Sequence, residues 1–68
     1  MSTIYQRFGE NVKILRKQRG LKQEKLAEMA KCDPRTIIAI EAGERNTTLK
    51  TINLLAHALK VSASELLS

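Results

Sequence analysis

The stretch from Gln23 to Glu41, QEKLAEMAKCDPRTIIAIE, decides how this chain folds. Both of its halves carry apolar residues at helical spacing. Asp33-Pro34 marks the start of the second half, because an aspartate accepts hydrogen bonds from the free amides of a first turn and a proline there gives up no needed donor. The stretch therefore predicts two short helices joined by about three residues, which forces a sharp crossing. Ala27 is the small residue expected where the two backbones meet.

Capping residues outside this stretch predict three more helices and no strand. A first helix opens at a possible capping box formed by Thr3 and Gln6, and Gly20 ends it. A fourth helix follows the central pair, and a last one starts at the capping box of Ser62 and Glu65. The fourth is expected to begin at Thr47 or Thr48 and to place its apolar residues on one side: Leu49, Ile52, Leu55, Ala56 and Leu59. Five helices in 68 residues predict a compact all-α domain spanning residues 1–68.

Size and residue types exclude several classes of function. A chain of 68 residues with no cluster of nucleophile, acid and base is not expected to be an enzyme or to hold a small-molecule substrate. One cysteine, Cys32, and one histidine, His57, cannot form a disulfide or a zinc site, so we expect no metal and no cofactor. There is no apolar run long enough for a membrane and no signal-peptide layout, which predicts a cytoplasmic protein without membrane association.

Basic residues are concentrated in one half of the sequence. The formal net charge is +5, from 12 lysines and arginines against 7 acidic residues. Residues 1–31 hold eight basic and three acidic residues, whereas residues 32–68 hold four of each. This asymmetry suits a polyanionic partner, although a solvated basic face explains it as well.

The sequence resembles the Xre/Cro-type helix-turn-helix transcriptional regulators, which include lambdoid phage repressors and restriction-modification controller proteins. The resemblance runs from about residue 8 to 67, with the helix-turn-helix at about 22–42, and rests on matches in the motif and in the flanking helices: Leu15-Arg16, Gly20-Leu21, Gln23, Leu26-Ala27, Ile37, Ile40-Glu41, Gly43, Leu49, Ala56, Leu59 and Leu66. It implies a five-helix, lambda-repressor-like DNA-binding fold.

The resemblance also implies that the helix at about 34–42 lies in the major groove of double-stranded DNA, with its first residues at the base edges. Those residues are Pro34, Arg35 and Thr36, with Ala39 one turn later. Arg35 is the leading candidate for reading a base, because a guanidinium can donate twice to O6 and N7 of guanine. A contact of Arg35 with phosphate alone is the alternative.

Other family positions carry phosphate contacts and a structural pair. By resemblance, Gln23 bonds a DNA phosphate at the start of its helix, where free amides favour anions. Lys22, Arg45 and Asn46 are further candidates for phosphate contacts. Arg16 and Glu41 are expected to form an internal ion pair that ties the first helix to the end of the recognition helix. Lys31 stands where the family often has glycine, so its φ is expected to be positive.

The family commonly dimerises through its last two helices. Leu54 is a large apolar residue at a position that is usually polar and exposed in the family. With Ile52 and Leu67 it is a candidate for a self-complementary dimer contact. The alternative is that these are apolar residues scattered over the surface. The resemblance therefore implies a homodimer on a near-palindromic operator. It leaves open whether the regulator is a phage-type repressor or a restriction-modification controller, and a DNA-binding antitoxin is the alternative function.

Overall fold

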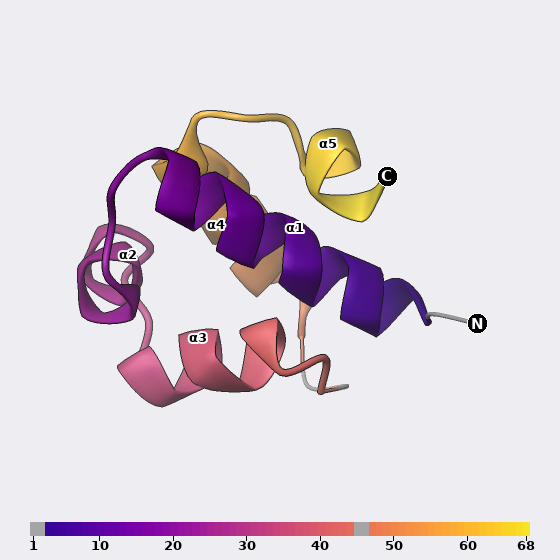
Figure 1. Cartoon of the computed structure of the whole chain (residues 1–68), viewed down its shortest axis with the longest axis horizontal. Helices are drawn as coiled ribbons and strands as arrows, with labels where there is room; N and C mark the ends of the chain where they lie inside the picture. The colour runs from indigo at the N-terminus through magenta and orange to yellow at the C-terminus, as the bar shows by residue number, and fades with distance from the viewer. Residues whose placement is uncertain (1–2, 45–46) are drawn as a thin grey trace.

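The computed structural model describes residues 3–44 and 47–68. In these residues the chain forms five α-helices and no strand, which confirms the all-α prediction (Figure 1). The helices are α1 (Ile4–Gln18), α2 (Gln23–Met29), α3 (Pro34–Glu41), α4 (Leu49–Leu59) and α5 (Ala63–Leu67). None of these helices is long and apolar enough to cross a membrane.

Most helices begin at a side chain that caps the first turn. Thr3 and Gln6 form the complete capping box of α1, with both reciprocal hydrogen bonds present. The side chains of Asp33, Thr48 and Ser62 accept from backbone amides at the starts of α3, α4 and α5. The predicted capping box of Ser62 and Glu65 is only half formed, since among the described residues only the bond from the Glu65 amide to the Ser62 hydroxyl is present. Lys22 makes no such bond at the start of α2. The capping signals in the sequence therefore located the helix starts, because these bonds are local.

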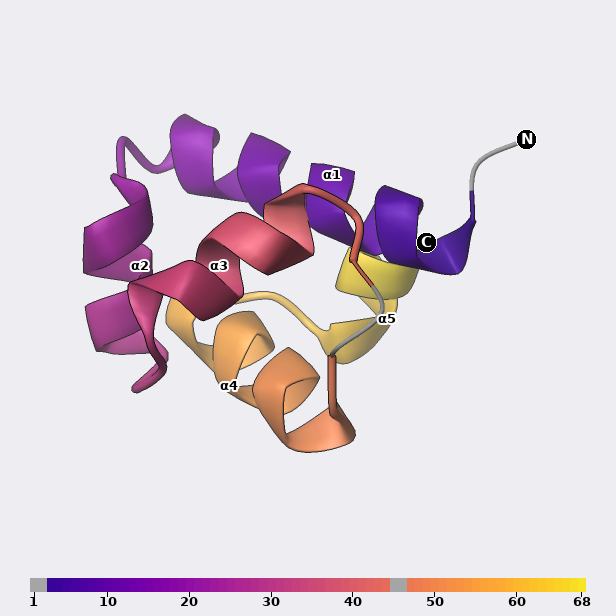
Figure 2. The ribbon, with the colours of Figure 1, turned by 90° about the horizontal axis from the view of Figure 1, so that it is seen from below.

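The core is shared by all five helices. Figure 2 shows α3 flanked by α2, α1 and α4, which places the two crossing helices against the rest of the fold. The largest fully buried side chains are Val12, Leu26, Ile37, Leu55, Leu59 and Leu66. Leu26 and Ile37 come from α2 and α3, so the crossing predicted from sequence is held by burial in a common core.

Gly9 lets α1 and α3 approach each other closely. A Cβ atom at this position would overlap the carbonyl oxygen of Ile40 at the end of α3. Gly9 is itself buried and helical, so its value lies in the missing side chain and not in its backbone freedom. The depth at which α3 sits against α1 therefore depends on this one residue.

The turn between α2 and α3 contains a strained residue. Lys31 has φ of 56°, in the left-handed region that side chains other than glycine seldom adopt, as its position predicted. The amide of Cys32 then donates to the carbonyl of Ala27 at 2.9 Å, and Cys32 packs half-buried against the core. The short connection thus holds the crossing angle of the two helices at a local energetic cost.

The C-terminal end of the chain is bound to the middle of α1. The side-chain amide of Asn11 donates to the carbonyl oxygens of Leu66 at 2.9 Å and of Ser68 at 3.1 Å. Figure 1 shows α5 lying beside α1 accordingly. These bonds satisfy carbonyls that the end of a helix leaves free, and Leu66 beneath them is fully buried.

Candidate nucleic-acid interface

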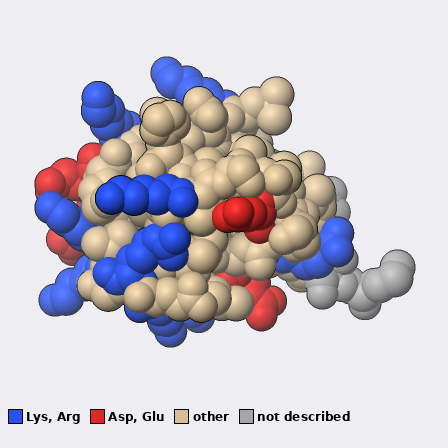
Figure 3. Space-filling view, turned by 90° about the horizontal axis from the view of Figure 1, so that it is seen from above, with Lys and Arg blue, Asp and Glu red and all other residues tan. Residues whose placement is uncertain are grey.

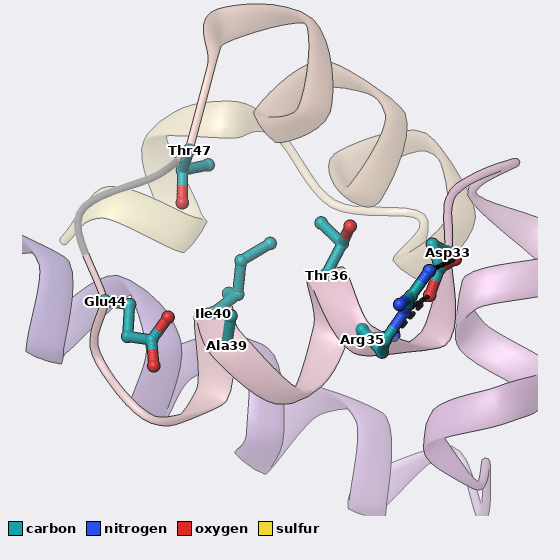
Figure 4. A pocket seen from close by; sticks show the side chains of 7 residues that line it. All are labelled: Asp33, Arg35, Thr36, Ala39, Ile40, Glu44 and Thr47. Atoms are coloured by element: carbon teal, nitrogen blue, oxygen red, sulfur yellow. Dashed lines mark hydrogen bonds and ion pairs between the residues drawn. The ribbon is translucent and has the colours of Figure 1, made fainter.

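One side of α3 borders an open hollow of about 320 Å³. Arg35, Thr36 and Ala39 line it from α3, and Glu44 and Thr47 line it from the segment that leads to α4 (Figure 4). Arg35 is exposed, whereas Thr36 and Ala39 are half-buried. Three of the four predicted base-reading residues therefore lie together, and the fourth, Pro34, is the exposed first residue of the same helix.

Arg35 is paired with the residue that caps its own helix. Oδ1 of Asp33 accepts from Nε of Arg35 at 3.1 Å, and Oδ2 accepts from Nη2 at 3.0 Å (Figure 4). The same Oδ1 also accepts from the backbone amide of Arg35 at 2.8 Å. The side-chain and backbone bonds from Arg35 lower the pKa of Asp33 from 3.8 to about 2, so the carboxylate is ionised throughout the neutral range. The sequence identified Asp33 only as a cap.

A buried ion pair joins the end of α1 to the end of α3. Arg16 donates to both carboxylate oxygens of Glu41, from Nε at 2.7 Å and from Nη2 at 3.0 Å. Nη1 of Arg16 donates to the carbonyl of Leu21 at 2.7 Å. Only 10% and 5% of the two side chains are exposed, so the pair is screened little by water. Both carboxylate oxygens of Glu41 accept hydrogen bonds from Arg16, and this paired geometry holds α1, the following loop and α3 together.

Gln23, a predicted phosphate contact, is also hydrogen-bonded to the ion pair of Arg16 and Glu41. Its Nε2 donates to Oε1 of Glu41 at 3.1 Å. The second amide proton and the amide oxygen remain for another partner. Lys22, the residue before α2, is exposed. The predicted contacts of Arg45 and Asn46 lie outside the described residues.

Charge alone does not locate a DNA-binding face. Figure 3 shows the face turned away from α3, and lysine and arginine side chains lie there too, more of them toward the end of the molecule that holds α2. The hollow beside α3, in contrast, has two acidic residues in its lining, Asp33 and Glu44. Sequence reasoning assigned neither of them to the site, because only the fold brings Glu44 beside α3.

A second, apolar groove lies between the first turns of α1 and α4 and the end of α5. It has a volume of about 240 Å³, and its lining residues are Ile4, Tyr5, Phe8, Thr47, Leu49, Ile52 and Leu67. Two of the three predicted dimer residues, Ile52 and Leu67, therefore lie in one groove. Leu49 was expected on the same side of the helix as Leu55 and Leu59, but unlike these two it is not buried: as the first residue of α4 it is 83% exposed.

The third predicted dimer residue, Leu54, differs from its expected position. It was expected to be exposed, but it is half-buried and packs against the hydrophobic core. Helical spacing places it between the buried and exposed sides of α4, where packing of the neighbouring helices decides its exposure.

Within residues 3–44 and 47–68, no group of three or more histidine, cysteine, aspartate or glutamate residues is arranged to hold a metal ion.

Comparison with known proteins agrees with this geometry. A family model described as "Helix-turn-helix" (HTH_3) matches residues 12–66. Control protein C.SmaI of Serratia marcescens is 41% identical over 61 residues, which are 90% of this chain and 73% of that protein. Control protein C.MunI of Mycoplasma sp is 36% identical in an alignment of 69 positions, which covers 100% of this chain and 93% of that protein.

A solved structure supports the same relation. The crystal structure of the restriction-modification controller protein C.AhdI from Aeromonas hydrophila matches with a TM-score of 0.87 and 37% sequence identity. The match covers 91% of this chain and 94% of that chain. The likeness therefore extends across the helices that flank α2 and α3.

Proposed function

The chain belongs to the Xre-type helix-turn-helix family of DNA-binding transcriptional regulators, and on that premise we propose that it binds a near-palindromic operator in double-stranded DNA as a homodimer. It acts by occupying DNA in the cytoplasm, without a chemical step. The observation that carries this proposal is the exposed guanidinium of Arg35 on the first turn of α3, beside the open hollow. A side chain so placed reaches base edges when the helix enters the major groove.

Base reading is assigned to the first turns of α3. Arg35 donates to guanine, and Thr36 donates, accepts or contacts a thymine methyl group. Pro34 and Ala39 contribute apolar contacts at the edges of this footprint. The exposure of Pro34 and Arg35 and the position of Thr36 and Ala39 in the hollow support this assignment.

Contacts with phosphate provide the part of binding that does not depend on sequence. We assign them to Gln23 and Lys22 at the start of α2, and to Arg45 and Asn46 before α4. Gln23 has one amide proton committed to Glu41, which fixes its side chain and leaves the other proton for a phosphate oxygen. Each neutralised phosphate releases a counterion, so binding weakens steeply with salt.

The apolar groove is the proposed dimer contact. Leu49, Ile52 and Leu67 line it together with Ile4, and burial of such a patch between two copies stabilises a symmetric dimer. Half-sites in this binding mode lie about 10–10.5 base pairs apart, or roughly 34–36 Å. The molecule measures 30 × 21 × 21 Å, which is of the same order as this half-site spacing.

The relatives point to the regulatory setting. Two curated relatives are control proteins, and a solved structural relative is a restriction-modification controller protein. We assign the same role to this chain, namely regulation of a restriction-modification system. Footprinting of the protein on DNA upstream of its own gene tests this role, and protection of a near-palindrome there is the expected result.

Arg35→Ala tests base reading directly. The variant is expected to lose about 10-fold or more in affinity for the operator, because a pair of hydrogen bonds to one base is removed. Affinity for random duplex DNA should change far less. Both affinities are measured by fluorescence anisotropy at several salt concentrations, with Lys25→Ala on α2 as the control for loss of one positive charge. Equal losses on the operator and on random DNA would remove Arg35 from base reading.

A further inference from the structure

Arg35 does not stand free at the start of α3. Its Nε and Nη2 both donate to the carboxylate of Asp33, at 3.1 and 3.0 Å. These bonds occupy one edge of the planar guanidinium group. The edge formed by Nη1 and the second proton of Nη2 has no partner among the described residues, and it offers the two parallel donors that fit O6 and N7 of guanine.

Asp33 is itself held in place by the helix that it caps. Its Oδ1 accepts from the backbone amide of Arg35 at 2.8 Å, and Pro34 restricts the backbone between the two residues. The carboxylate is therefore anchored to the first turn of α3 and not to a flexible loop. The hydrogen bonds from Arg35 favour the ionised carboxylate, which lowers the pKa of Asp33.

Two physical consequences follow for Arg35. An arginine side chain has many rotamers, and a partner that restricts them before binding reduces the entropy lost on binding. A carboxylate 3.0 Å from the guanidinium also cancels much of its field at a distance. A phosphate attracts chiefly through charge, whereas a base edge attracts through the direction of hydrogen bonds. The pairing therefore weakens the competing phosphate contact more than the base contact.

The geometry points to Asp33 as a positioning residue that orients Arg35 for guanine and reduces its attraction to phosphate, so that Asp33 sets the sequence specificity of the protein without touching DNA. The inference rests on the proposed function, since it concerns how α3 reads its operator. It assigns Asp33 a role beyond helix capping.

Asp33→Asn separates these two roles. An asparagine keeps an oxygen that accepts from the amide of Arg35, and it is as good a cap as aspartate. It removes the charge that pairs with the guanidinium. We expect the ratio of operator affinity to random-DNA affinity to fall about 10-fold. The salt dependence on random DNA should steepen by about one unit in the log–log slope, because Arg35 is then available for a phosphate.

The probe is a duplex selected from a random library by the wild-type protein. Each guanine of the half-site is replaced in turn by 7-deazaguanine, which lacks the N7 acceptor. The wild-type protein should lose affinity at one guanine, and Asp33→Asn should lose clearly less there. Glu28→Gln on α2 is the matched control, since it makes the same change in net charge and Glu28 contacts Lys25 instead of Arg35.

A double-mutant cycle with Arg35→Ala shows whether Asp33 acts through Arg35. In the Arg35→Ala background, Asp33→Asn should leave the specificity ratio unchanged. Serine also caps helices, so Asp33→Ser should show the same loss of specificity ratio as Asp33→Asn. Agreement between the two variants makes a folding defect in one of them an insufficient explanation. Thermal melting of each variant verifies that the fold is kept.

The outcomes distinguish this inference from the function on which it rests. A wild-type protein that selects no duplex contradicts both. If the wild-type protein prefers the selected duplex over random DNA and both Asp33→Asn and Asp33→Ser show the same preference, the role of Asp33 is overturned. The operator-binding function then still stands. A loss of specificity that persists in the Arg35→Ala background also overturns it, since Asp33 would then act independently of Arg35.

Discussion

Lys31 shows how a single residue can set a turn at the expense of stability. Its φ of 56° costs a side chain other than glycine about 1–2 kcal/mol. Lys31→Gly removes that strain but gives the unfolded chain more freedom. We expect a net increase of about 0.5–1 kcal/mol in the free energy of unfolding, measured by urea denaturation.

A control for this substitution removes the same charge in a helix. Lys17 is exposed in the last turn of α1, where glycine is less favourable than lysine by up to about 1 kcal/mol. Lys17→Gly should therefore destabilise the protein while Lys31→Gly stabilises it. Loss of stability in both variants would show that the turn does not strain Lys31.

Arg16 and Glu41 illustrate the opposite case, in which two residues depend on each other. Removing one partner leaves a buried charge unpaired and is expected to cost about 3–5 kcal/mol, whereas replacing both by apolar residues costs much less. Arg16→Met and Glu41→Leu should each lower the urea midpoint strongly, and the double variant should recover part of the loss. Additive losses would contradict the view that the ion pair acts as a unit.

At the scale of the helices, the decisive contact is the one between α1 and α3. Gly9→Ala places a methyl group against the carbonyl of Ile40, so α3 must move outward or tilt. Overpacking of this kind costs about 1–3 kcal/mol, and it should weaken operator binding because α3 changes its presentation. Glu10→Ala, on the exposed side of the same helix, is the control and should change neither thermal stability nor binding appreciably.

The helices also show what the sequence could and could not predict. Capping boxes and the Asp33-Pro34 pair fix helix starts within a few residues, so the five helices and the grouping of Arg35, Thr36 and Ala39 on α3 were predictable. The Gly9 contact was not, since it depends on a helix distant in sequence. The exposures of Leu49 and Leu54 were not predictable, and Leu54 was wrongly expected to be exposed. Helical spacing gives the direction of a side chain but not which neighbouring helices cover it. The resemblance to a family, and not periodicity, supplied the roles.

At the scale of the whole molecule, the apolar groove decides whether the protein acts as one copy or two. Leu49→Lys places a charge in the proposed contact, where burial of an unpaired charge is costly. We expect the dissociation constant of the dimer to rise at least about 10-fold, measured by sedimentation over a concentration series. Leu49 is 83% exposed, so the monomer fold should be kept.

Ile14 provides the control for this experiment. It is a comparable aliphatic residue, 46% exposed, on α1 outside the groove. Ile14→Lys should leave sedimentation unchanged. Unchanged sedimentation of Leu49→Lys as well would remove the groove from the dimer contact, with the DNA-reading role of α3 unaffected.

The bond from Asn11 to Leu66 has a kinetic consequence. The two residues are 55 positions apart, and closing a loop of that length costs about 3.5 kcal/mol from the logarithmic dependence on length alone. Local helices can form within microseconds, but the contact of α1 with α5 must await this closure. During synthesis, α1 emerges before α5, so the part of its apolar side that Leu66 covers stays exposed until α5 has left the ribosome, whereas α3 can cover the rest earlier.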